Sequence, residues 1–117
     1  MGNSKEWDSN QESAWYVIRT PATQESTTKT RMIDRLRTRQ LIQLGMQIVV
    51  PKEILANSQE AEKYTGFILV RMHLQHEIWK TISNTPGVTG YVGMGTMPTA
   101  FPEIDWTEIP FDRFSHM

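Results

Sequence analysis

The order of strand-like and helix-like segments is the feature that most constrains the fold. Four short runs rich in aromatic and β-branched residues lie at 15–18, 46–50, 67–72 and 88–92, and this composition is typical of β-strands. Segments with helical spacing of apolar residues follow the first and the third run. The order strand–helix–strand–strand–helix–strand predicts an α+β fold of the ferredoxin-like or RRM-like class. In this class two main helices cover one face of a four-stranded antiparallel sheet.

Each helical segment has an apolar stripe and an expected stop. The stripe of the first comprises Ile33, Leu36, Leu41 and Leu44, and that of the second comprises Leu74, Ile78, Trp79 and Ile82. We expect Thr23 to cap the first helix and Gly45 to end it. The turn at 84–87 should end the second, and Asn57-Ser58 should turn the polar segment 52–64. The run 67–72 is nearly all apolar, which predicts a central strand.

Composition limits the classes of function. A chain of 117 residues with a formal net charge of -1 fits one domain that is not basic overall. It has no signal-peptide pattern and no apolar run of the roughly 20 residues that a membrane span requires. Cysteine is absent, and His73, His76 and Glu77 are too few ligands for a typical metal site. With no nucleophile–base pair or carboxylate dyad, we expect no metal, no cofactor and no enzyme activity.

Basic residues are concentrated in the first helical segment. They are Lys29, Arg31, Arg35, Arg37 and Arg39, with Asp34 as the one acid among them. Helical spacing aligns Arg31 with Arg35 and sets Lys29 elsewhere on the helix. Two interpretations remain open, a solvated helix face or a surface that contacts nucleic-acid phosphates without reading sequence.

Four blocks, in order, carry a resemblance to a known family. They read WYVI at 15–18, VPKE at 50–53, ILVRM at 68–72 and, after Trp79, NTPGVTGYVG at 84–93. The last block is the most specific, and together they resemble the N-terminal (NGN) domain of NusG-type transcription factors over residues 14–99. We expect residues 1–13 to be a flexible tail and residues 100–117 a C-terminal tail or a truncated linker.

The sequence departs from the family in three places. Residues 64–67 read Tyr-Thr-Gly-Phe, where the family usually has Phe-Pro-Gly-Tyr. The loop at 52–63 is shorter and more acidic than the family's basic hairpin. The C-terminal KOW barrel is absent, which indicates a truncated chain or, as the alternative, a natural single-domain relative. Contacts to Rho or the ribosome are therefore not expected.

The resemblance implies a domain that binds RNA polymerase on the clamp helices of the β′ subunit, reaches toward the β lobe, and modulates pausing, processivity and termination. It implies polymerase contacts at Tyr16, Tyr64, Gly66, Phe67, Thr85, Pro86 and Val88, although Tyr16 and Phe67 have a plain alternative as core residues. It also implies contacts to non-template DNA from Lys29, Arg31, Arg35 and Arg39.

An RRM-like module that binds single-stranded nucleic acid is the alternative function. It requires exposed aromatics within a basic glycine–aromatic motif on the central strands, and residues 67–72 lack that motif. The expected compartment is the bacterial cytoplasm, with the plastid stroma as a second possibility.

Overall fold

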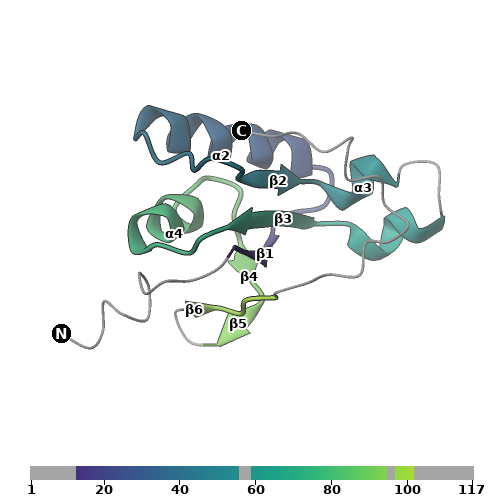
Figure 1. Cartoon of the computed structure of the whole chain (residues 1–117). Coiled ribbons are helices and arrows are strands. Elements are labelled where there is room, and N and C mark those ends of the chain that lie inside the picture. The colour runs from purple at the N-terminus through teal and green to yellow at the C-terminus, as the bar shows by residue number, and fades with distance from the viewer. Residues whose placement is uncertain (1–12, 56–58, 95–96, 102–117) are drawn as a thin grey trace.

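The computed structural model describes residues 13–55, 59–94 and 97–101. The elements are β1 (Ala14–Arg19), α2 (Glu25–Thr38), β2 (Gln47–Val49), α3 (Pro51–Ile54), the 3-10 helix η1 (Gln59–Tyr64), β3 (Phe67–Met72), α4 (His76–Ser83), β4 (Gly90–Tyr91), β5 (Gly93–Met94) and β6 (Met97–Pro98). One antiparallel sheet has the order β2-β3-β1-β4, and α2 and α4 pack on one side of it (Figure 1). The predicted α+β fold and the central position of residues 67–72 are confirmed.

The pairing of β1 with β3 determines which side chains share a face. All six residues of each strand are paired, from Ala14 opposite Met72 to Arg19 opposite Phe67. β2 pairs with the other side of β3, and β4 pairs with β1. Since successive side chains in a strand point to opposite faces, this register divides the sheet residues into a face toward the helices and a face away from them.

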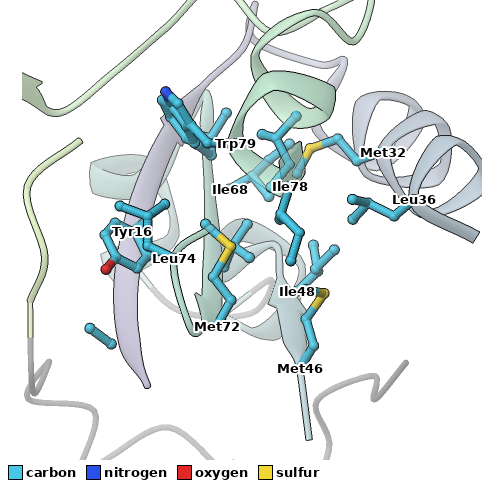
Figure 2. Packing of buried hydrophobic residues seen from close by; sticks show 14 of the residues in the cluster. Tyr16, Met32, Leu36, Met46, Ile48, Ile68, Met72, Leu74, Ile78 and Trp79 are labelled. Atoms are coloured by element: carbon cyan, nitrogen blue, oxygen red, sulfur yellow. The ribbon is translucent and has the colours of Figure 1, made fainter. Parts of the chain in front are cut away.

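The main core lies between the sheet and the two helices. The sheet contributes Tyr16, Ile18, Ile48, Ile68 and Val70 to this core. The helices α2 and α4 contribute Met32, Leu36, Ile78, Trp79 and Ile82 (Figure 2). Full burial stabilises each large apolar side chain by roughly 1.5–3 kcal/mol. At one margin the Trp79 and Tyr91 rings meet edge to face, with centroids 4.9 Å apart. This core holds both helices on the same face.

The first helix differs from its prediction at both ends. The residue at the N-cap is Gln24, because Thr23 has a φ of 73° and lies in left-handed backbone before the helix begins. The helix ends at Thr38, and the chain enters left-handed backbone two residues later. Leu41 therefore reaches the core from a loop, and Leu44 is fully exposed.

Other boundaries also differ from their predictions. Pro51 begins α3 rather than only ending a strand, since proline at the first turn of a helix loses no hydrogen bond. The predicted turn at Asn57-Ser58 lies outside the described residues, as do the predicted tails apart from residues 13, 100 and 101. No helix in the described segments has the length and apolarity that crossing a membrane requires.

A buried polar cluster joins the start of β3 to α2. The Gly66 amide donates to Glu25 Oε2 at 2.7 Å, and the Thr20 amide donates to the Gly66 carbonyl at 2.9 Å. The hydroxyls of Thr20 and Thr28 are 2.9 Å apart, and Lys52 Nζ lies 3.9 Å from Glu25 Oε2. Glu25 is only 4% exposed, and a buried carboxylate is tolerated only with such partners.

Gly66→Ala should destabilise the domain more than Gly45→Ala. Both glycines have left-handed backbone, with φ of 83° and 82°, which costs a residue with a side chain about 1–3 kcal/mol. A Cβ at Gly66 would also lie 2.8 Å from the Thr20 carbonyl oxygen, whereas one at Gly45 meets nothing within 4 Å. Urea unfolding of both variants measures the difference, and equal losses of stability would contradict the packing argument.

The buried phenol of Tyr16 should make stability depend on pH in the alkaline range. Burial raises the pKa of Tyr16 above its ordinary value of 10.0. As the pH rises, the unfolded chain therefore releases the phenol proton at a lower pH than the folded protein does. The stability that the protonated phenol contributes is present below the ordinary pKa and is lost as the pH rises through the folded-state pKa. Tyr16→Phe should lose less unfolding free energy than wild type between about pH 9 and about pH 11. Identical pH profiles would show that the phenol is not buried.

Candidate functional site

The face of the sheet opposite α2 and α4, here called the open face, carries a second apolar cluster. Trp15, Val49 and Leu69 are its buried floor, and Val17, Ile54, Leu55, Tyr64 and Phe101 pack partly buried around it. In the described residues no long helix covers this face. Val17, Tyr64 and Phe67 are half-buried, so apolar surface remains available to a partner there.

Two segments of the chain border this cluster. On the β2 side, Ile54 and Leu55 come from the end of α3, and Tyr64 comes from the end of η1. On the β1 side, Phe101 forms an antiparallel bridge with Trp15, in which the amide of each donates to the carbonyl of the other at 2.9 Å. Directly opposed residues share a face, so Phe101 extends the apolar cluster beyond β1.

Tyr16 does not belong to the open face. Its side chain is 3% exposed and points from β1 into the core with Met72 and Leu74 (Figure 2). The alternation of Trp15 and Tyr16 on opposite faces is confirmed, but the helices pack on the Tyr16 side. The core interpretation therefore holds for Tyr16, whose side chain is not available to a partner in this structure.

The predicted contacts at 64–67 separate into two roles. Tyr64 and Phe67 are half-buried, Tyr64 in the second cluster and Phe67 on the open face. The guanidinium carbon of Arg19 lies 5.2 Å from the centroid of the Phe67 ring, a cation–π distance. Gly66 between them is buried and holds the turn. Its role in this structure is conformational, and the two aromatics supply the surface.

The turn at 85–88 belongs to the helix side of the molecule. Thr85 is buried and its hydroxyl donates to the Thr81 carbonyl at 2.8 Å, which continues the end of α4. Val88 packs against the main core. Pro86 is exposed, and its carbonyl accepts from Arg31 Nη1 at 3.4 Å. The structure thus does not bring Thr85, Pro86 and Val88 together with the open-face cluster.

The basic residues of α2 also separate. Arg35 and Arg39 line a hollow of about 170 Å³ between α2 and α4, together with Glu77, Lys80, Thr81 and Asn84. Arg31 lies one turn before Arg35. Lys29 is half-buried, and this burial lowers its pKa while Glu53 opposes the shift. Three of the four predicted residues therefore share one helix face, and Lys29 does not.

The sequence alone did not identify the buried floor of the open face or the arginine beside it. It predicts strands at Trp15 and Leu69, and it indicates no role for Arg19. Strand alternation groups Trp15, Val17 and Arg19 on one face, so the signal was present once the helix side was known.

The part of the chain that the structure describes contains no group of three or more residues placed to hold a metal ion.

Known proteins resemble this chain in both sequence and fold. The NusG family model, described as transcription termination factor nusG, matches residues 13–109. The chain is 37% identical over 86 residues to a protein of Streptomyces coelicolor named transcription termination/antitermination protein NusG, covering 68% of this chain and 29% of that protein. A Rickettsia bellii protein of the same name is 30% identical over 96 residues, and the match covers 76% of this chain and 50% of that protein.

A solved structure of Thermotoga maritima NusG, reported for its domain interaction, has the same fold. It superposes with a TM-score of 0.64 at 22% identity, covering 81% of this chain and 52% of that chain. The chain spans half or less of the length of the two relatives above. The family model matches most residues of this chain, and the structure has the NGN fold. This chain therefore belongs to the NusG family.

Proposed function

We propose that this chain is an RNA-polymerase-binding domain of a transcription factor and that its open face docks on the clamp helices of the polymerase β′ subunit. One observation carries the proposal, an apolar patch with half-buried Val17, Tyr64 and Phe67 on the sheet face that α2 and α4 leave uncovered. The relatives' shared name, transcription termination/antitermination protein, supports a role in transcription.

The patch has properties that suit a helical partner. Its floor of Trp15, Val49 and Leu69 belongs to a paired sheet, so little conformational entropy is lost when a partner binds. Tyr64 and Phe67 are aromatics with few rotamers, the kind of side chain that contributes most to binding energy. An amphipathic helix that lays its apolar stripe on such a floor is a common mode of recognition.

The proposed effect is a shift between polymerase states rather than catalysis. A domain bound to the clamp helices, reaching toward the β lobe, favours whichever clamp conformation it binds more tightly. Pausing, processivity and termination would change accordingly. We propose residues 14–99 as the domain, with Phe101 joined to it, acting in the cytoplasm beside the polymerase. Contacts to Rho or the ribosome are not part of the proposal.

Tyr64→Ala should weaken binding to the isolated clamp-helix hairpin of the β′ subunit. Loss of an aromatic anchor costs at least ~1 kcal/mol, about a fivefold increase in Kd. Titration calorimetry measures the affinity, and circular dichroism checks the fold. Leu44→Ala is the matched control, because Leu44 is fully exposed in the loop between α2 and β2.

Three outcomes of this titration are informative. A loss of affinity for the hairpin with Tyr64→Ala but not with Leu44→Ala supports docking through the open face. Unchanged affinity of that variant removes Tyr64 from the interface. Failure of the wild-type domain to bind the hairpin would refute the proposed partner.

We further propose that the helix layer contacts non-template DNA through Arg31, Arg35 and Arg39. The specific observation is that Arg35, Arg39 and Lys80 converge on one hollow between α2 and α4. Phosphate oxygens accept hydrogen bonds from guanidinium groups, and such contacts position a strand without reading its bases.

Arg35→Ala/Arg39→Ala should weaken binding to a single-stranded DNA oligonucleotide, measured by fluorescence anisotropy at several salt concentrations. The slope of log affinity against log salt should fall by about 0.7 for each phosphate that the variant no longer binds. Arg37→Ala is the control, since a residue two positions from Arg35 points to another side of the helix. An equal change of slope for each arginine removed, in both variants, would indicate only a general charge effect.

The same assay tests the RRM-like alternative. That module stacks bases on exposed aromatics of the central strands, but Trp15 is only 4% exposed and Arg19 lies over the Phe67 ring. A larger loss of affinity for single-stranded DNA with Phe67→Ala than with Arg35→Ala/Arg39→Ala would favour the RRM-like alternative.

A further inference from the structure

Two arginines stand at opposite ends of the open-face patch. Arg19 ends β1 opposite Phe67, and Arg71 lies on β3 opposite Trp15. Both are exposed, and both alternate with residues of the main core, so they share the face of Val17 and Leu69. The apolar floor thus lies between two cations.

Neither cation is neutralised by its neighbours in the described part of the sheet. The segments that form the sheet strands contain no aspartate or glutamate. Glu25 of the buried polar cluster pairs with Lys52 and not with either of these arginines. Arg19 contacts the Phe67 ring, which orients its guanidinium without satisfying its charge. A carboxylate on a partner is the natural counterpart.

The register gives the separation of the two arginines. Arg71 is paired with Trp15, which precedes Arg19 by four residues on the same strand. Four residues at about 3.3 Å each give about 13 Å along the strand, and the step of about 4.8 Å between neighbouring strands brings the separation of the two backbone positions to about 14 Å. A partner helix has 3.6 residues per turn and rises about 1.5 Å per residue. Side chains on its sheet-facing side that are about seven or about eleven residues apart therefore span about 11 or about 17 Å, which brackets this separation.

We propose that Arg19 and Arg71 select a clamp helix that carries two carboxylates on its sheet-facing side, about seven or about eleven residues apart, at the two ends of an apolar stripe. The proposal rests on the proposed function, because it assigns what that partner must present. The arginines then set the register and direction in which the helix lies on the sheet. Like charges at those positions would be repelled, which supplies specificity beyond the apolar contact.

The test is charge reversal at each end of the patch. Arg19→Glu and Arg71→Glu should each raise the Kd for the clamp-helix hairpin at least about fivefold at low salt, and added salt should narrow the difference. Arg37→Glu is the matched control, because it makes the same charge change on exposed α2 surface of the helix layer. Arg19→Gln and Arg71→Gln serve as milder variants, and thermal unfolding confirms that each protein folds.

A second arm identifies the partner carboxylates. Each surface Asp or Glu of the hairpin is changed to Lys in turn. One change should restore binding to the Arg19→Glu domain, and a different change, about seven or about eleven residues away on the same side of the helix, should restore binding to the Arg71→Glu domain. Restoration of both by one change, or by none, would overturn the assigned spacing.

The outcomes separate this inference from the docking proposal. If Arg19→Glu and Arg71→Glu bind like Arg37→Glu while Tyr64→Ala still weakens binding, the selection by charge is wrong and docking stands. If the wild-type domain does not bind the hairpin, docking itself fails. If the reversals weaken binding to single-stranded DNA but not to the hairpin, the two arginines face nucleic acid and the inference is overturned.

Discussion

The antiparallel pairing of β1 with β3 is the constraint on which the rest of this structure depends. Its six-residue register places Ile18 and Ile68 under the helices and Trp15 and Leu69 on the open face. A slip of one residue would exchange these two sets, exposing the core and burying the cations. The same register also sets the distance between Arg19 and Arg71, so the fold and the proposed docking surface follow from one alignment.

The turn before β3 shows how closely structure and proposed function are joined. Gly66 permits the left-handed turn and donates to the buried Glu25 carboxylate. This hydrogen bond ties the beginning of α2 to the sheet. It also places Tyr64 and Phe67 on either side of the turn, where each keeps part of its ring exposed. In this short segment of proposed contact residues, the glycine therefore holds the backbone geometry that leaves the two aromatic rings partly exposed.

The proposed contacts divide between the two layers of the domain. The open face offers apolar floor and aromatic surface to a protein helix, whereas the hollow between α2 and α4 offers arginine donors to phosphate. Because the sheet lies between the two surfaces, a partner on one leaves the other accessible. This separation is what the proposed function requires, with a polymerase subunit on one surface and nucleic acid on the other.

The sequence by itself determined the order of the four sheet strands and the two main helices, the central place of 67–72, the opposite faces of Trp15 and Tyr16, and the family. These follow from local periodicity and ordered motif blocks, which did not predict α3, η1, β5 or β6. Tertiary structure alone decided that the helices pack on the Tyr16 side, that the first helix ends before Leu41, and that Phe101 pairs with Trp15. Alternation is symmetric between the two faces of a strand, so only long-range packing distinguishes the core side from the exposed side. A bridge between residues 15 and 101 likewise depends on how distant segments meet, which no local pattern encodes.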